Sequence, residues 1–195
     1  MLRRLLIGLA VVLALLTIFG FFALRPYQIP SSAMEPTLSC AKGPTGPGCL
    51  GSTNDRVLAC RICLDLGNPS RGDIVVFDTP EEAALKCGEG GVFVKRVIGL
   101  PGETVREDKR GYIWIKKPGS STFVRLQEPY VSVQGRRADS QHFGETWRVA
   151  SGQYFTMGDN RSESCDSRTW GGVPGANMIG TVVLRYWPLP RFGFP

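Results

Sequence analysis

The stretch Val92–Gly102, VFVKRVIGLPG, decides how this chain should fold. Its β-branched and aromatic residues predict a strand, and the Gly/Pro residues that follow predict a turn. A lysine in the middle of such a strand is unusual. Burial would disfavour the charged ammonium and lower the pKa of Lys95, which would make it a usable general base. The alternative is that Lys95 extends its head group into solvent from a half-exposed strand.

The same β pattern continues through the rest of the chain, with turn signals such as Asn68-Pro69 between the runs. The predicted strands are Arg56–Ala59, Ile74–Phe77, Val92–Val94, Tyr112–Ile115, Gln153–Met157 and Thr181–Leu184. No long amphipathic helical pattern follows residue 25. We therefore expect a mostly β fold, with an antiparallel sheet or barrel-like body, a loop at residues 41–51 and a smaller irregular subdomain at about residues 106–150.

An apolar segment precedes this body. Leu5–Leu24 reads LLIGLAVVLALLTIFGFFAL and contains no charged residue. As a helix with a rise of about 1.5 Å per residue it would be roughly 30 Å long, the thickness of the hydrocarbon core of a bilayer. A cleaved secretory signal is the alternative, but its apolar region is usually about 7–15 residues long and a small-x-small cleavage site follows it. The sequence therefore predicts a single uncleaved transmembrane helix.

Arg3 and Arg4 set the expected orientation of this helix. The positive-inside rule keeps them in the cytoplasm, which makes residues 1–4 a cytoplasmic tail and sends residues 25–195 across the membrane. Arg25 is a single opposing charge. We expect a single-pass plasma-membrane protein with an extracytoplasmic domain.

Composition narrows the possible functions. The 195 residues suffice for one domain of moderate size plus the anchor. The net charge of +6 suits an anionic bilayer surface. Basic residues are interspersed with acidic ones, as in Arg106–Arg110, REDKR, so we expect no nucleic-acid partner. The single histidine, His142, lies in a polar run that predicts an exposed loop, and one histidine excludes sites that need several. We expect no metal and no cofactor.

Two further segments have compositions typical of functional sites. Ile29–Leu38, IPSSAMEPTL, follows the predicted anchor, and its small hydroxyl residues between prolines predict a stiff, exposed backbone. Gly158–Arg168, GDNRSESCDSR, is dense in hydrogen-bonding groups, although by itself it also fits a solvated loop with a local Asp–Arg pair.

Together these segments resemble the bacterial type I signal peptidases, peptidase family S26, over nearly the whole chain. The resemblance rests on the anchor, Ile29–Leu38, Arg71–Phe77, Lys95–Gly102, Gly158–Arg168 and the closing Tyr186-Trp187-Pro188. It implies a membrane-bound serine endopeptidase that uses a Ser/Lys dyad to remove N-terminal signal peptides from exported preproteins. The implied partners are signal peptides of the Ala-x-Ala type and membrane lipid, and the oligomeric state stays open.

The resemblance assigns catalytic roles position by position. In the family's motif the nucleophilic serine directly precedes Met-x-Pro-Thr-Leu, and here that position holds Ala33. Lys95 would be the neutral general base, and Ser164 would hydrogen-bond and orient it. Ser31 Oγ and the backbone N–H of residue 33 would form the oxyanion hole. Ser32 is one residue early, and on an extended backbone its side chain would point to the other side.

The resemblance also implies supporting and substrate-binding residues. Asp166 and Arg168 would form an ion pair that supports the site, with Asp159 nearby. The substrate would lie as an added strand along an edge, and small pockets would favour Ala because larger side chains are excluded. The implied pocket residues are Tyr27, Ile29, Pro30, Met34, Leu38, Phe93 and Val94.

Ala33 leaves two hypotheses. In the first, a serine was changed to alanine to stop self-cleavage or trap substrate, and the presence of every other catalytic position favours it. In the second, the chain is a natural pseudo-peptidase that binds signal peptides without cutting them. Self-cleaving repressors share the Ser/Lys chemistry, but they would need a DNA-binding helix-turn-helix where this chain has its apolar segment.

The six cysteines of a domain expected outside the cytoplasm can form disulfides. Cys40 and Cys49 bracket the Gly/Pro-rich loop, and Cys87 and Cys165 flank the two segments that carry Lys95 and Ser164, so we expect each pair to be bridged. Cys60-Arg61-Ile62-Cys63 would then be either a tight bridge, which needs a turn, or free thiols. One CxxC without a second pair is weak support for zinc.

Overall fold

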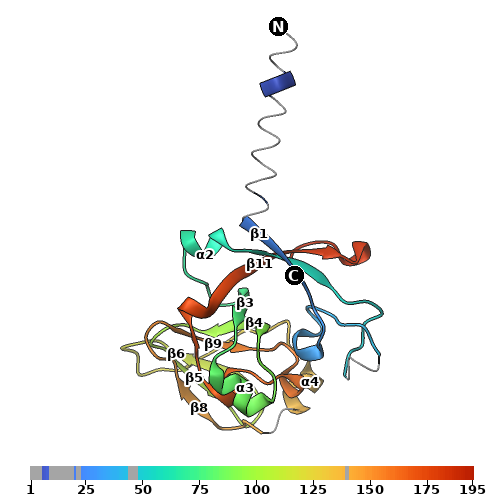
Figure 1. Cartoon of the computed structure of the whole chain (residues 1–195). Coiled ribbons are helices and arrows are strands. Elements are labelled where there is room, and N and C mark those ends of the chain that lie inside the picture. The colour runs from blue at the N-terminus through green and yellow to red at the C-terminus, as the bar shows by residue number, and fades with distance from the viewer. Residues whose placement is uncertain (1–5, 9–19, 21–22, 44–47, 139–140) are drawn as a thin grey trace.

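The computed structural model describes residues 6–8, 20, 23–43, 48–138 and 141–195. Its body is built on two antiparallel sheets (Figure 1). The larger sheet has the strand order β1-β2-β11-β3-β4-β9-β10. These strands are β1 (Leu24–Gln28), β2 (Arg56–Cys60), β3 (Ile74–Asp78), β4 (Val92–Gly99), β9 (Gln153–Met157), β10 (Val173–Pro174) and β11 (Met178–Trp187). The smaller sheet, with order β7-β6-β5-β8, comprises β5 (Thr104–Glu107), β6 (Ile113–Lys116), β7 (Val124–Arg125) and β8 (Thr146–Arg148).

Helices in the described body are short. They are α2 (Ile62–Leu66), α3 (Glu81–Cys87), α4 (Val133–Ala138) and α5 (Ser167–Trp170), together with the 3₁₀ turns η1 (Ser32–Met34), η2 (Arg161–Glu163), η3 (Gly175–Asn177) and η4 (Leu189–Arg191). All six predicted strands are found, and the prediction of a mostly β, antiparallel fold is confirmed. Strand β1 was missed because its first residue, Leu24, was assigned to the anchor, whereas it pairs with Cys60 of β2.

Strand β3 is buried on both faces, and its alternating side chains therefore enter two different cores. Ile74 and Val76 belong to the core that extends to β1 and η1, whereas Val75 and Phe77 belong to the core closed by Trp170 of α5. A third core joins the smaller sheet to the ends of β4 and β9. It consists of Ile98, Val105, Ile113, Ile115, Val149, Phe155 and Met157. The smaller sheet is thus anchored on β4 and β9 of the larger one.

Three disulfides tie loops to this frame: Cys40–Cys49, Cys60–Cys63 and Cys87–Cys165. The first and third pairings are confirmed as predicted. Of the two alternatives for Cys60 and Cys63, the bridge is formed, and the turn that starts α2 supplies the change of direction that this close spacing needs. Both sulfurs are therefore used in a disulfide and not as zinc-binding thiolates.

Most of the predicted membrane anchor (residues 5, 9–19 and 21–22) and the predicted tail (residues 1–4) lie outside the described residues. Among the helices of the described part of the chain, none is long and apolar enough to cross a membrane. The anchor and its orientation therefore stay predictions.

Candidate active site

Lys95 lies near the middle of β4, where it pairs with Val75 of β3, and only 4% of its surface is exposed. Of the two alternatives that the sequence left open, burial is the one observed. Desolvation of the ammonium lowers the pKa of Lys95 to about 8, an effect that the negative charge of Asp166 partly offsets and the positive charge of Arg168 reinforces. The Nζ atom also lies 5.5 Å from the centroid of the Phe93 ring. Lys95 is thus suited to accept a proton near neutral pH.

Lys95 opens onto a groove of about 580 Å³ between β1, η1 and β4. Six of the predicted substrate-binding residues line it: Tyr27, Ile29, Pro30, Met34, Phe93 and Val94. Ser31 and Ala33 line the same groove, so it brings together the residues predicted as nucleophile position, general base and oxyanion serine. For Leu38 the structure corrects the prediction, because this side chain is fully buried in the core with Ile29 and Met34 and does not line the groove.

Ala33 is the central residue of η1, and its surface is 6% exposed. Asn160, from the loop after β9, holds this turn in place. Its backbone N–H donates to the Ala33 carbonyl at 3.1 Å, and its side-chain Nδ2 donates to the Ser32 carbonyl at 3.1 Å. The position of Ala33 is therefore set by two hydrogen bonds from a segment more than a hundred residues away in the sequence.

Ser32 takes a different direction. The argument against it assumed an extended backbone, but Ser32 and Ala33 lie in a 3₁₀ turn, where successive side chains are about 120° apart. A Cβ placed on Gly48 would lie 3.0 Å from Ser32 Oγ, so this hydroxyl faces the disulfide-closed loop. Ser32 also lines the groove, but its hydroxyl lies against this loop, and its exclusion as the nucleophile stays a prediction.

Ser164 is held by the carboxylate of Asp166, to which its hydroxyl donates at 2.8 Å. Asp166 also accepts from Arg168 Nε at 2.9 Å and from the Gly158 N–H at 3.0 Å. The predicted Asp166–Arg168 ion pair is thus formed and buried. The bond expected between Ser164 and Lys95 is absent from the hydrogen bonds of the described residues, so the orienting role of Ser164 stays a prediction.

Arg96, the neighbour of Lys95, points to the opposite face of β4. Its Nε and Nη2 donate to the two carboxylate oxygens of Asp159 at 2.8 and 2.7 Å, and its guanidinium lies 4.0 Å from the centroid of the Tyr130 ring. Thr37 Oγ1 donates to the same carboxylate. This bidentate pair ties β4, the loop after β9 and the segment after η1 together around the groove.

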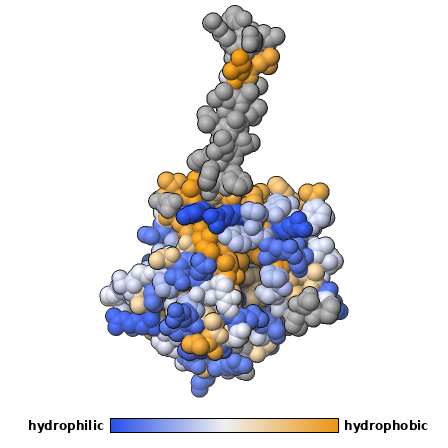
Figure 2. All heavy atoms as spheres, in the orientation of Figure 1, coloured by the Kyte–Doolittle hydropathy of each residue, from blue (hydrophilic) through white to orange (hydrophobic). Residues whose placement is uncertain are grey.

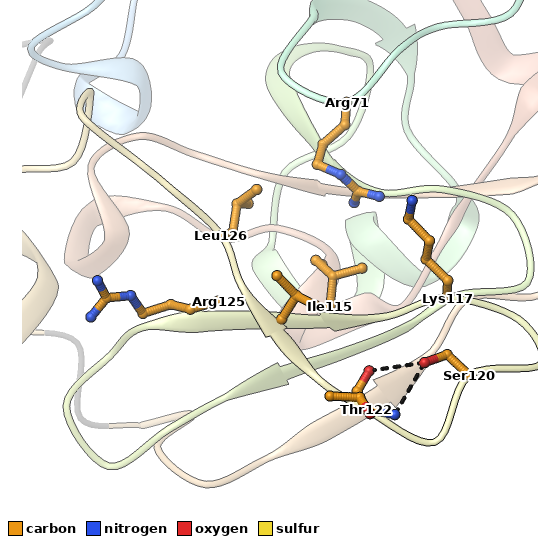
Figure 3. A pocket seen from close by; sticks show the side chains of 8 residues that line it. Arg71, Ile115, Lys117, Ser120, Thr122, Arg125 and Leu126 are labelled. Carbon is orange, nitrogen blue, oxygen red and sulfur yellow. Dashed lines mark hydrogen bonds between the residues drawn. The ribbon is translucent and has the colours of Figure 1, made fainter.

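A second pocket, of about 330 Å³, lies on the smaller sheet and is lined by Arg71, Ile115, Lys117, Ser120, Thr122, Val124, Arg125 and Leu126. Figure 3 shows Arg71 and Lys117 approaching each other at one side of it, while Arg125 extends away. None of the predicted site residues lines it. His142 also lies with the smaller sheet, 6.1 Å from the Trp147 ring and half-buried, whereas the sequence predicted an exposed loop residue. Neither feature belongs to the groove.

Comparison with known proteins identifies the family. The family model described as "Signal peptidase, peptidase S26" matches residues 2–187. The chain belongs to the signal peptidase family S26. It is 39% identical to signal peptidase I of Leptolyngbya laminosa, over 96% of this chain and 79% of that protein. It is 36% identical to the probable signal peptidase I-1 of Synechocystis sp., over 96% of this chain and 83% of that protein. The chain also matches the crystal structure of a signal peptidase I from Enterococcus faecalis V583, with 31% identity and a TM-score of 0.43. The match covers 58% of this chain and 96% of the Enterococcus chain.

Several residues of this signal peptidase groove were not identified from the sequence. Glu89 and Glu163 place carboxylates in its wall, and the Cys87–Cys165 bridge forms part of the lining. Asn160 lies inside the polar segment Gly158–Arg168, and its hydrogen-bonding amide was the feature of the sequence that could have indicated its role in holding η1. Nothing in the sequence indicated the role of Gly158, because that role depends on the close approach of its backbone to Ala33, which is distant in the sequence.

Proposed function

We propose that this chain is a type I signal peptidase whose groove binds signal peptides and whose alanine at position 33 prevents it from cutting them. One observation carries the proposal: Lys95, with a pKa lowered to about 8 by burial, lies in the same groove as the position that holds the nucleophile in the family's motif. In this proposal the chain lacks a hydroxyl and keeps the general base.

The geometry supports the following reaction when a serine stands at position 33. Neutral Lys95 accepts the hydroxyl proton while the serine oxygen attacks the carbonyl carbon of the scissile peptide. The N–H of residue 33 and the hydroxyl of Ser31 stabilise the negative oxygen of the tetrahedral intermediate. The proton then passes to the leaving amine, an acyl-enzyme ester remains, and a water molecule activated by Lys95 hydrolyses it.

The groove supports a preference for small side chains before the cut. Its walls combine a proline, two aromatic rings and branched aliphatic residues around Ala33, so a signal peptide could lie extended along β1 or β4 with its small side chains facing the wall. Larger side chains would be excluded sterically, which fits the Ala-x-Ala pattern. Signal peptides of exported preproteins are therefore the proposed substrates.

We further propose the single-pass topology derived from Arg3, Arg4 and the apolar segment that ends near residue 24, with residues 25–195 as the extracytoplasmic domain. Apolar surface at the end of the body that carries β1 and α2 supports it (Figure 2). Exposed apolar side chains belong to α2, to the last residue of β11 and to the chain after it: Leu66, Trp187, Leu189, Phe192 and Phe194. Such a surface fits contact with a bilayer at the point where the predicted anchor enters the body.

A natural pseudo-peptidase that binds signal peptides is the alternative. The intact Lys95, Ser164 and Asp166–Arg168 constellation favours a serine-to-alanine change in an otherwise complete enzyme, because a site free of selection would drift at these positions too. A serine codon at position 33 of the encoding genomic sequence would rule the pseudo-peptidase out.

Restoring the hydroxyl tests the proposal. The Ala33→Ser full-length chain, reconstituted in detergent or liposomes, is expected to cleave a preprotein directly after an Ala-x-Ala sequence, whereas the parent chain yields no product. Mass spectrometry of the released fragments locates the cut, and the same preprotein with bulky residues in place of both alanines is the matched control. A folded Ala33→Ser protein that does not cleave would contradict the proposal.

A further inference from the structure

A closed cluster of charged side chains lies beneath the groove, where the loop after β9 meets the smaller sheet. Its members are Glu107, Glu128, Arg136, Arg161, Asp166 and Arg168, each at most 8% exposed. A buried charge is costly unless it is paired, so a cluster of this size is expected where it holds a particular geometry. The proposed reaction assigns no role to the two glutamates.

The cluster clamps the backbone of Gly158 from both sides. The Gly158 N–H donates to Asp166 at 3.0 Å, and its carbonyl accepts from Arg161 Nε at 3.1 Å. A Cβ at this position would collide with the Ala33 carbonyl oxygen and with Ser164 Oγ. Gly158 is therefore in direct contact with both the nucleophile turn and the serine beside Asp166, and a shift of its peptide would move both.

Arg161 and Arg168 each pair with a glutamate that comes from outside the larger sheet. Glu128 binds Arg161 through Oε1 and Arg136 of α4 through Oε2, the latter at 2.8 Å. Glu107, the last residue of β5, places Oε2 3.8 Å from Arg168 Nη1. The Glu107 backbone is fixed as well, because its N–H donates to the Glu145 carbonyl at 3.0 Å and its carbonyl accepts from Gly144 at 3.0 Å.

We propose that Glu107 is a positioning residue of the catalytic centre, which in its ionised form holds Arg168 on Asp166 and thereby keeps Gly158 in place beneath the nucleophile turn. This inference rests on the proposed signal peptidase function. It gives the smaller sheet a part in catalysis, since β5 supplies a carboxylate whose effect reaches the groove through Arg168, Asp166 and Gly158.

The titration of Glu107 makes this role visible. Burial raises the pKa of Glu107 to about 7, although Arg168 and Arg161 oppose the shift and Asp166 and Glu128 add to it. Because the pKa in the folded state exceeds the ordinary value of 4.5, ionising Glu107 reduces the stability of the fold between about pH 4.5 and pH 7. A carboxylate that is ionised at this expense in stability, next to the Asp166–Arg168 ion pair, fits a positioning role better than a purely structural one.

The test compares Glu107→Gln with its parent, both carrying Ala33→Ser in the full chain. The amide copies protonated Glu107 at every pH. At pH 9 we expect the kcat of the variant to be about 10-fold lower, and at pH 5.5 the two rates to agree within about twofold, with KM unchanged at both. Glu103→Gln is the matched control, since Glu103 is also buried and pairs with Arg71 at 2.6 Å, outside the charged cluster. Its effect on kcat should not depend on pH.

A second measurement, on the Ala33 chain, is independent of activity. Chemical denaturation should show the stability of Glu107→Gln improving relative to the parent as the pH rises from 5 to 8, because only the parent ionises a buried carboxyl. The proposal is overturned by a loss in kcat that is equal at all pH values, by a loss confined to KM, or by no loss. An inactive Ala33→Ser parent would instead overturn the proposed function, and this inference with it.

Discussion

The groove and the charged cluster beneath it differ in almost every physical property. The groove is open and combines apolar walls with Lys95 and the carboxylates of Glu89 and Glu163, whereas the cluster is closed to solvent and consists of paired acids and arginines. The groove can accept one substrate after another, because it selects them by shape and by steric exclusion of large side chains. The cluster fixes a single arrangement, because buried ion pairs lose much of their stabilisation when either partner moves. Substrate binding is thus assigned to the groove and the positioning of the catalytic groups to the charged cluster. The two regions meet at Gly158.

The largest loss of cleavage activity is expected from a substitution in the groove. Lys95→Met in an Ala33→Ser chain removes the general base while keeping an apolar side chain of similar length. We expect cleavage to fall by at least about 10³-fold, since an unactivated serine hydroxyl is a weak nucleophile. Single-turnover cleavage of a preprotein measures the rate. Activity within about tenfold of the parent would mean that another group accepts the proton.

A smaller effect is expected where the two regions meet. Gly158→Ala in the Ala33→Ser chain introduces a Cβ that must displace the carbonyl of residue 33 or Ser164. We expect kcat to fall by about 10- to 100-fold, because small displacements of catalytic groups have effects of this size. The matched control is Gly67→Ala, since a Cβ at Gly67 meets no atom within 4 Å. If both variants behaved alike, Gly158 would not connect the two regions.

The sequence revealed the groove better than the cluster, for a physical reason. Lys95 stands out as a charge within an apolar strand, so local pattern alone singled it out. Tyr27, Ile29 and Ala33 come from one continuous segment, and their place in the site was implied by the family resemblance. The cluster brings together β5, α4, η2 and α5, which are distant in the sequence. Glu107 sits in the run Arg106–Arg110, which looks like a solvated charged face, and only the packing of the smaller sheet buries it.

Two other differences have similar causes. Leu38 shares a motif with the groove residues, but its side chain turns inward and is fully buried. Ser164 belongs to the expected segment, yet its hydroxyl binds Asp166, because the backbone between them brings the carboxylate within 2.8 Å. The sequence motifs predicted that these two residues lie near the site, but tertiary packing determines which residues they contact.

The most direct test of the account is the pKa of Lys95 in the chain as it stands, with Ala33. Full-length protein labelled with ¹³C at lysine Cε can be titrated by NMR in detergent micelles, and Lys95→Met identifies the signal. The account predicts a midpoint near pH 8, because burial disfavours the ammonium. A midpoint near the ordinary value of 10.5 would contradict it, since almost no Lys95 would then be neutral at physiological pH and able to act as the base.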